Sequence, residues 1–521
     1  MPITLSLRFP TGRYAAAAWD DRDHPEWPPH PARLALAFVD VLHKAGKPRT
    51  LHAALSWLGE QSPPCIVIPK DGDIDVQRMD GFFVPQNPSQ ADGTKHSRKS
   101  RSFPSVFLNP EHPTVFFHWP DALPDEATLA GLSELATRLP RFGHSSSLVI
   151  AEVSREAPPI GGEWRTLLPA RDPLFTTDHK LRVPYAGLLE AAEAAFAAEA
   201  RTTEMAALIG KAAKSAKPDK PLKPAASPRG RHDPRHQWQG YIEEVSAAVS
   251  VTPWDNRVML LARASGPQTG LISTWLTIEL LHKTLLDRWT RDPERGPVPP
   301  WISGHQPGKG KTAPARDNHL AFFPVANIHH AHAQGRIMGI GLAFPRPETA
   351  GIDPVALRLD WQKAMACLFP QGAPLELVAA SGEPRMILQP ANPDESRKAF
   401  QPSRWIGPAS RWSTVTPVIF DRHPKPDFKK DPVAWQNSCH QIILGACQRI
   451  GLPDPKYIDV SLYSGIKGVP PSSAFAPPPA RPDRPARVHL HVTLSFAEKV
   501  VGPLLLGAGR FRGYGLFAPL D

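Results

Sequence analysis

Hydrophobic and polar residues alternate over residues 3–9, as they do in a strand with one buried face. Residues 31–46 instead carry apolar side chains at helical spacing, with proline in the first turn and glycine just past the end. Four short apolar runs, a second helical segment and a closing strand follow, at residues 65–69, 81–85, 105–108, 114–119, 123–139 and 147–153. This order predicts a β-α-β-β-α-β unit of the ferredoxin-like type.

Two further sets of strands and helices follow in the second half of the chain. The first set comprises residues 257–264, 271–289, 319–325, 336–345 and 354–369, and then shorter strand-like pieces. The second set comprises residues 413–422, 432–452, 457–464, 487–496 and the tail 502–517. No fixed sequence period links the sets. We therefore predict an α+β protein with tandem ferredoxin-like (RRM-like) domains, one N-terminal and two C-terminal, joined by a basic proline-rich linker.

The linker is predicted where composition changes. An alanine-rich helical stretch, residues 185–216, leads into residues 217–237, whose prolines and positive charges do not sustain a packed core. The predicted boundaries are 1–212 for an N-terminal domain with a helical extension, 213–240 for the linker and 241–521 for the tandem region. A basic arm lying on phosphates is the alternative to a solvated linker.

Charge indicates the class of partner. The 521 residues include 60 Lys and Arg against 50 Asp and Glu, a formal charge of +10, which favours a partner rich in phosphates or simply a basic soluble protein. The four cysteines lack the paired spacing of a structural zinc site. Because no export signal and no run of 18 apolar residues is present, we expect a cytoplasmic protein without contact to a membrane.

The tail of the chain has the most informative composition. Five glycines, at positions 502, 507, 509, 513 and 515, are interleaved with Arg510, Phe511, Arg512 and Tyr514. Glycine lets the backbone approach phosphates, arginine supplies charge, and aromatic rings can stack on bases. Tight turns between strands also require glycine, so a structural turn remains the alternative.

Histidines form the second candidate group. His305 lies near Lys309 and Lys311, and His319 precedes an apolar strand. Imidazole can take and give a proton near neutral pH, and the two lysines can hold a phosphate. His329, His330 and His332 suggest a metal hydrolase as a further hypothesis, but no Asp or Cys neighbours them. Surface or hydrogen-bonded structural histidines are the alternative in each case.

Basic residues of the first unit are candidates for RNA contact. They are Arg8 and Arg13 near the first strand, and Arg98, Lys99 and Arg101 in a predicted loop. Solvated surface charge is the equal alternative. The sequence has no Walker, HExxH or GxSxG motif, so ATPase, metalloprotease and lipase-like functions lack their usual support.

With these residues in view, the chain resembles the fused subunit of type I-U (also called I-G) CRISPR systems (GSU-type Csb family), in the repeat-associated RNA-binding superfamily. The stretches that carry the resemblance are residues 8–19, 26–34, 303–305, 317–324, 332–345 and 502–517.

The resemblance implies an N-terminal part like the subunit that holds the 5′ handle of a guide RNA, fused to a part like the repeat endoribonuclease. Nucleases of this superfamily cut without metal, through the 2′-hydroxyl, and leave a 2′,3′-cyclic phosphate. It also implies a histidine base, for which we favour His305 and then His319. RNA contact by the glycine-rich loop maps onto Gly507, Gly509, Arg510, Arg512, Gly513 and Gly515.

The expected partners are CRISPR repeat RNA, mature crRNA, the backbone and large subunits of a type I-U (I-G) interference complex and, indirectly, target DNA. No cofactor is expected. Because some members of the superfamily bind RNA without cutting it, a non-catalytic assembly subunit is the alternative.

Overall fold

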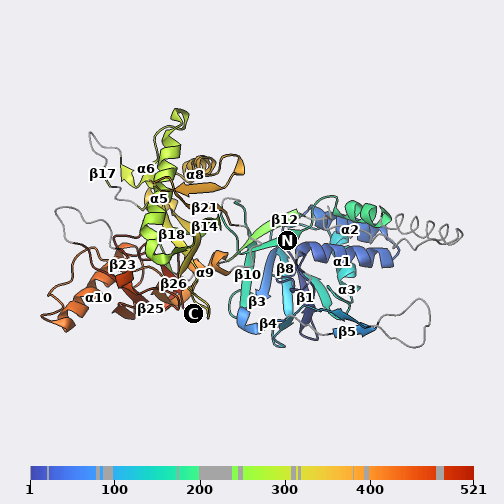
Figure 1. Cartoon of the computed structure of the whole chain (residues 1–521). Coiled ribbons are helices and arrows are strands. Elements are labelled where there is room, and N and C mark those ends of the chain that lie inside the picture. Colours follow the sequence, from blue (N-terminus) through green and yellow to red (C-terminus); the bar gives the residue numbers. More distant parts are fainter. Residues whose placement is uncertain are drawn as a thin grey trace, which may run out of the picture. The chain divides into compact units, whose positions relative to one another are not determined.

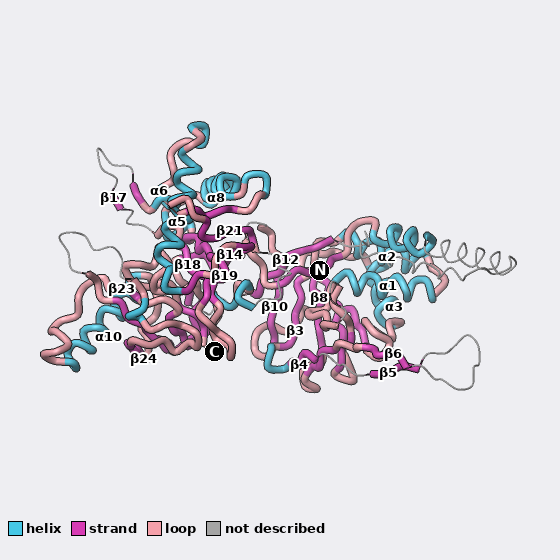
Figure 2. The backbone as a smooth tube through the Cα atoms, in the orientation of Figure 1, coloured by secondary structure: helices cyan, strands magenta, loops and turns pink. Residues whose placement is uncertain are grey.

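The structure is a computed structural model with two compact units. It describes residues 2–19, 21, 23–77, 82–85, 98–172, 175–198, 237–244, 250–306, 313–314, 318–379, 381–391, 398–476 and 486–520, and only the backbone at 71, 82–85, 98–101, 250 and 313–314. The first unit combines residues 1–170 with 179–244, and the second combines 171–178 with 245–521 (Figure 1). Figure 2 shows that both units combine helices with strands.

The first unit is built on a seven-stranded sheet in the order β11-β12-β10-β3-β8-β1-β9. Its strands are β1 Ile3–Arg8, β3 Cys65–Pro69, β8 Thr114–Trp119, β9 Ile150–Ser154, β10 Trp164–Pro169, β11 His179–Val183 and β12 Gln237–Glu243. Its helices include α1 Pro31–Lys44, α2 Arg49–Glu60 and α3 Glu126–Thr137, and residues 188–198 are also helical. Smaller sheets are formed by β2 Arg13–Ala15, β4 Ile74–Gln77 and β7 Ser105–Leu108, and by β5 Phe82–Pro85 with β6 Arg98–Arg101.

Local sequence explains these elements. Ile3, Leu5 and Leu7 alternate along β1 and are buried, so one face of the strand supplies the core. The carboxylate of Asp125 caps α3 by accepting a hydrogen bond from the backbone N–H of Thr128. Helices α2 and α3 pack so closely at Gly131 that a Cβ there would lie 2.7 Å from the Ala54 Cβ.

The second unit contains two six-stranded sheets. The first has the order β15-β19-β14-β21-β20, with β18 paired to β19. Its elements are β14 Trp254–Ser265, β15 Thr269–Gly270, β18 Ala321–Ala326, β19 Arg336–Pro345, β20 Leu375–Val378 and β21 Pro384–Pro390, with α5 Thr274–Thr290, α6 Pro300–Ser303, α7 Pro347–Ala350 and α8 Pro354–Leu368. The short strands β16 His305–Gln306 and β17 Ala313–Pro314 pair with each other.

The second sheet of this unit has the order β13-β25-β22-β26, with β23 and β24 also paired to β25. Its elements are β13 Ser250–Val251, β22 Ala409–Thr414, β23 Val418–Ile419, β24 Tyr457–Ser461, β25 His489–Val501 and β26 Phe517–Pro519, with α9 Ser403–Ile406 and α10 Pro432–Arg449. One hydrophobic core joins the two sheets, and it includes the rings of Phe323 and Trp405, whose centres are 5.8 Å apart.

The predicted mixture of helix and sheet is confirmed. In each of the three large sheets, four strands lie side by side in the same order, which is the second, third, first and fourth of the four along the chain. The sets are β3-β8-β1-β9, β18-β19-β14-β21 and β24-β25-β22-β26. Residues 213–236 of the predicted linker lie outside the described residues, and 237–240 begin β12. Among the helices that the structure describes, none has the length and apolar character needed to cross a bilayer.

Candidate functional site

The glycine-rich loop connects β25 to β26, and packing requires its glycines. Gly507, Gly513 and Gly515 have φ angles of +82°, +80° and +69°, and L-residues that carry a side chain rarely adopt such a backbone conformation. A Cβ on Gly513 would lie 2.1 Å from Ile278 Cδ1 on α5, and one on Gly515 would lie 1.9 Å from the Leu506 carbonyl oxygen. A Cβ on Gly509 would lie 2.6 Å from Ile419 Cδ1. At these positions the space that glycine leaves open is occupied by protein atoms.

A stack of three side chains joins this loop to the strand that begins near His319. The ring centres of His319 and Phe511 lie 3.5 Å apart, with 23° between the ring planes. The guanidinium carbon of Arg510 lies 4.4 Å from the centre of the Phe511 ring, and Arg510 Nη1 donates to the Gly507 carbonyl oxygen at 3.2 Å. The structure therefore brings together two segments that the sequence singled out separately.

His319 is held in a neutral state. Burial lowers the pKa of His319 to about 3, and the positive charges of Arg510 and Arg512 act in the same direction. His319 Nδ1 lies 3.2 Å from the Leu320 carbonyl oxygen. A Cβ added to Gly304 would lie 2.9 Å from His319 Cε1, 3.1 Å from Nε2 and 3.3 Å from Nδ1, so Gly304 packs against the imidazole ring itself. The ring therefore contacts both Phe511 and Gly304.

His305 is exposed and lies next to Gly304 at the start of β16. Its Nδ1 lies 2.9 Å from the Ser303 carbonyl oxygen. Because a carbonyl oxygen only accepts hydrogen bonds, Nδ1 carries the proton, and Nε2 of the neutral ring keeps its lone pair. This geometry is suited to a general base.

Arg512 and His282 complete the cluster. Burial lowers the pKa of Arg512, and the carboxylate of Glu279 on α5 offsets only part of this effect. Burial lowers the pKa of His282 to about 4, with smaller effects in the same direction from Arg512 and His305. His282 Nε2 donates to the Ile302 carbonyl oxygen at 3.1 Å. His282 was not predicted as a site residue, because a histidine on the apolar face of a helix usually indicates a core position.

Three other residues of the second unit that the sequence singled out are Tyr514, Lys309 and Lys311. Tyr514 is fully buried, and its hydroxyl donates to the Ala476 carbonyl oxygen at 2.5 Å, so this ring is not open to a base. Lys309 and Lys311 lie outside the described residues.

The histidine run at residues 329–332 lies in the turn before β19, where the His329 N–H donates to the Lys467 carbonyl oxygen at 2.9 Å. Within the described ranges, no three His, Cys, Asp or Glu side chains form a group that could hold a metal ion.

Two of the basic candidates in the first unit have described side chains. Arg8 ends β1 and is exposed. Arg13 Nε donates to the Ser105 hydroxyl at 3.0 Å, and its guanidinium carbon lies 6.0 Å from the centre of the Phe107 ring. The side chains of the other three, at positions 98, 99 and 101 of β6, lie outside the described part of the structure.

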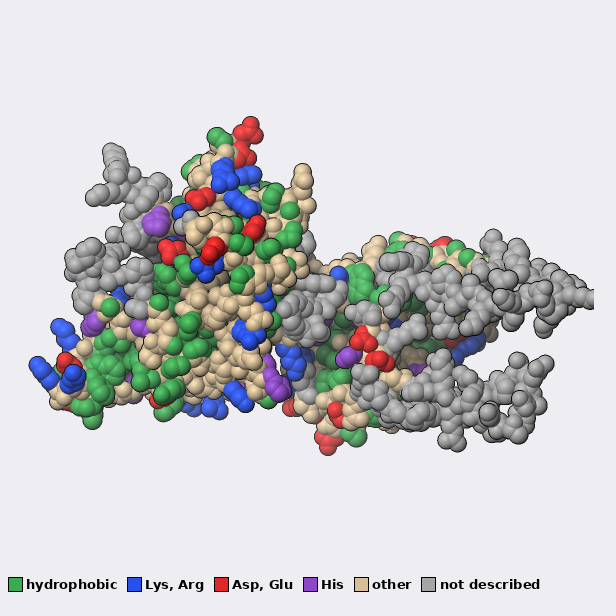
Figure 3. Space-filling view, viewed as in Figure 1, with side chains coloured by type: hydrophobic (Ala, Val, Ile, Leu, Met, Phe, Trp, Pro, Cys, Tyr) green, Lys and Arg blue, Asp and Glu red, His purple; other side chains and the backbone are tan. Residues whose placement is uncertain are grey.

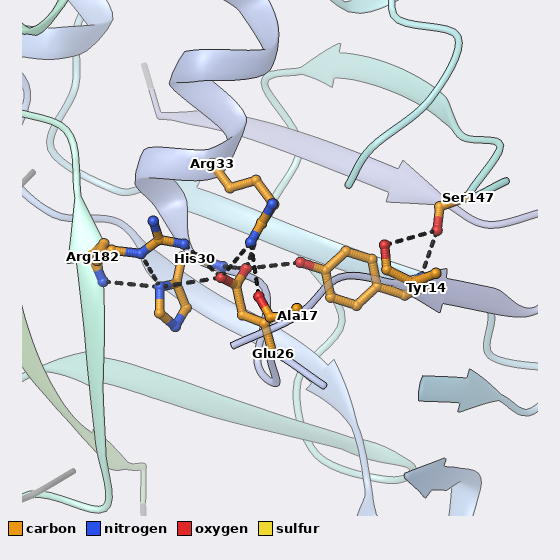
Figure 4. A network of polar contacts seen from close by, with 8 residues as sticks. Tyr14, Ala17, Glu26, His30, Arg33, Ser147 and Arg182 are labelled. Carbon is orange, nitrogen blue, oxygen red and sulfur yellow. Dashed lines mark hydrogen bonds and ion pairs between the residues drawn. The ribbon is translucent and has the colours of Figure 1, made fainter. Parts of the chain in front are cut away.

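A buried ionic network in the first unit was not predicted from the sequence (Figure 4). Glu26 Oε2 accepts hydrogen bonds from Arg33 Nη2 at 2.8 Å and from Arg182 Nη2 at 2.6 Å, and Glu26 Oε1 accepts one from the Tyr14 hydroxyl at 2.8 Å. Burial by itself would raise the pKa of Glu26, but the charges and hydrogen bonds around it hold that pKa well below its usual range. Burial lowers the pKa of His30 to about 4, so its neutral Nδ1 accepts from Arg182 Nε at 2.9 Å.

Charge on the surface does not by itself mark one binding face. On the face of the second unit that Figure 3 shows, Lys and Arg side chains form several separate groups, interspersed with acidic ones. Local geometry is therefore the better guide to a site.

Comparison with known proteins gives a family for the second unit. The family model described as "CRISPR-associated protein, GSU0054 family" matches residues 259–519, half of the chain. No curated protein matches. A solved structure titled "CRISPR associated protein Cas6" is similar at 10% identity over 51% of this chain and 98% of that chain, with a TM-score of 0.25. At so low a TM-score, the likeness supports neither a fold nor an activity.

Proposed function

Because the chain belongs to the GSU0054 family of CRISPR-associated proteins, we propose that it binds CRISPR repeat RNA, cuts it without a metal ion and stays bound as part of an interference complex. The observation that carries this proposal is the exposed imidazole of His305 beside a cluster that contains Arg510 and Arg512 of the glycine-rich loop.

In the proposed reaction, the ribose 2′-hydroxyl next to the scissile phosphate attacks phosphorus. His305 Nε2 takes the hydroxyl proton as the 2′-oxygen–phosphorus bond forms and the bond to the 5′-oxygen breaks. The 5′-oxygen takes a proton from solvent and the protonated His305 gives its proton back to solvent, which leaves a 5′-hydroxyl and a 2′,3′-cyclic phosphate. Arg512 and Arg510 hold the phosphate backbone and stabilise the negative charge that develops. Lys309 and Lys311 are proposed to assist them.

His319 has a positioning role in this scheme. With a pKa of about 3 it is a weak base at neutral pH, and its ring is covered by Phe511 and Gly304. It holds the loop that carries the two arginines, so its replacement is expected to impair RNA binding together with cleavage.

The proposal extends to the whole chain. The recurring strand order supports tandem ferredoxin-like domains, one in the first unit and two in the second. The first unit is proposed to hold the 5′ handle of the guide RNA. Its contacts would come from Arg8, Arg13, Arg98, Lys99 and Arg101. The protein would assemble with backbone and large subunits in the cytoplasm and contact target DNA indirectly.

Cleavage of labelled repeat RNA by the purified chain tests the proposal. We expect His305→Ala to bind the RNA with unchanged affinity and to cut it at least about 100-fold more slowly, the usual contribution of a general base. His332→Ala, another exposed histidine, serves as the matched control and should cut at the wild-type rate. Full cleavage by His305→Ala would contradict the assignment of the base.

A non-catalytic assembly subunit is the second candidate. It is favoured by the fact that, within the described residues, the His305 side chain bonds only to its own segment at Ser303, so no other element orients the imidazole. Wild-type protein that binds repeat RNA tightly and leaves it intact would support this candidate.

A further inference from the structure

Two indole rings are exposed on the first unit. All fourteen tryptophans of the chain lie within the described residues, and only Trp19 and Trp238 are exposed, at 36% and 39%. A large aromatic ring that is partly exposed at the surface offers apolar area to a ligand, and such rings are enriched where proteins bind their partners. These two rings come from distant segments of the chain, and each is related to Arg182: Trp19 lies against its guanidinium, and Trp238 lies opposite it in the strand register.

The strand register places three side chains on one side of a strand pair, and a fourth packs against one of them. Trp238 of β12 lies directly opposite Arg182 of β11, and Lys180 is two residues before Arg182, so all three point to the same side of the strand pair. The guanidinium carbon of Arg182 lies 4.9 Å from the centre of the Trp19 ring, and the Lys180 ammonium nitrogen lies 5.4 Å from the centre of the Trp238 ring. We call these four side chains the indole row. It lies at the edge of the large sheet, because β11 is the outermost strand.

The buried ionic network fixes the centre of the indole row. Arg182 is only 4% exposed and is held by Glu26 at 2.6 Å and by His30 Nδ1 at 2.9 Å (Figure 4). The His30 ring centre lies 6.1 Å from that of Trp238. The network therefore orders Arg182, which supports the Trp19 ring without itself facing solvent, and a pre-ordered ring lowers the entropic cost of binding a ligand.

We propose that the indole row is a stacking site for bases of single-stranded RNA. Bases stack on aromatic rings whatever their identity, and nearby cations attract the phosphates between them. A cationic ligand such as a methylated lysine fits less well, because each indole already has a positive group over its ring. The inference rests on the proposed RNA-binding function and adds a contact surface of the first unit, independent of the proposed cleavage site.

The test uses the full chain with both indoles changed. Trp19→Ala with Trp238→Ala should weaken binding of single-stranded repeat RNA at least about tenfold, as expected for lost base stacking. Trp19→Phe with Trp238→Phe keeps both rings and should bind within about threefold of wild type. Phe196→Ala removes another exposed aromatic ring of the same unit and should leave the affinity unchanged. Cleavage per bound RNA should be the same in all four proteins.

A second measurement keeps the inference testable if the alanine variant fails to fold. In the wild type, bound RNA should shield tryptophan fluorescence from acrylamide, and the phenylalanine variant should show much less of this protection. Equal affinity of the folded alanine variant, or no protection by bound RNA, would overturn the stacking site while leaving RNA binding in place. A wild-type chain that binds no repeat RNA would instead overturn the proposed function itself.

Discussion

The ring of His319 lies 3.5 Å from the ring of Phe511, centre to centre. His319 precedes β18, and Phe511 lies in the middle of the glycine-rich loop, so this contact fixes the loop against the first sheet of the second unit. Backbone contacts agree, because Phe322 of β18 forms an isolated bridge with Arg512. The proposed cleavage site depends on this attachment, since the loop carries both arginines.

Arg512→Ala should weaken binding of repeat RNA and lower the slope of log affinity against log salt by about 1, because one phosphate contact is lost. Anisotropy titrations at several salt concentrations measure both quantities. Lys429→Ala removes an exposed charge at another place in the same unit and is the control. A salt slope identical to that of the wild type would show that the loop is a purely structural turn without phosphate contact.

His319→Phe should make the protein less sensitive to acid. The folded pKa of about 3 lies below the usual value of 6.5, so the unfolded chain takes up a proton that the folded state excludes. Stability is therefore complete above about pH 6.5 and falls as the pH drops towards 3. For this one group the loss between pH 7 and pH 5 is about 2 kcal/mol.

The phenylalanine variant keeps a ring against Phe511 and removes the titration. Urea unfolding gives the free energy of unfolding at pH 7 and at pH 5. The fall in this free energy between the two pH values should be about 2 kcal/mol smaller in the variant than in the wild type. His332→Phe, at an exposed position, is the control. An unchanged pH dependence would show that His319 is not enclosed in this way.

Gly515→Ala should destabilise the second unit by about 4 kcal/mol or more, because its Cβ would collide with backbone as well as require a left-handed conformation. The collision is with the Leu506 carbonyl oxygen, at 1.9 Å. Gly451 has a similar φ of +76° but nothing within 4 Å of an added Cβ, so Gly451→Ala isolates the backbone strain. The Gly451→Ala control should lower the free energy of unfolding by about 1 kcal/mol, as measured by thermal or urea unfolding. Equal losses would mean that the loop is not packed as described.

Glu26→Gln should destabilise the first unit by about 3 kcal/mol or more, because the buried guanidinium of Arg182 and the partly buried one of Arg33 lose their counter-charge. Asp40→Asn breaks a surface pair with Lys44, whose side chains are 54% and 56% exposed, and should cost less than about 1 kcal/mol. Chemical unfolding of the two variants gives the comparison. A loss from Glu26→Gln as small as that from Asp40→Asn would contradict the burial of the network.

Local patterns in the sequence were sufficient for much of the fold. The alternation in β1 and the proline-led helix α1 lie where the pattern predicts them. The predicted strand 413–422 is divided into β22 and β23, with Pro417, which cannot donate to a ladder, between them. Helix α2 and strands β10 to β12 were not predicted, and β12 begins within residues assigned to the linker. Its pairing with β10 and β11 depends on contacts distant in sequence.

The candidate site shows the same limit. Composition identified the glycine-rich loop, His305 and His319, but nothing local indicates that Phe511 stacks on His319 or that Arg182 reaches Glu26. These contacts depend on how whole elements pack. The glycines illustrate the difference between composition and geometry, because the sequence suggested close approach to phosphates and the structure fills the space beside them with protein.

The most direct test is incubation of the purified chain with its own labelled repeat RNA in excess EDTA, beside the same RNA with a 2′-deoxy sugar at the cleavage position. The proposed mechanism predicts cleavage of the all-ribose strand to a 2′,3′-cyclic phosphate and a 5′-hydroxyl, and no cleavage of the deoxy strand, with both bound equally. Repeat RNA that is bound but left intact in EDTA, or a deoxy strand that is cut as well as the ribose strand, would contradict it.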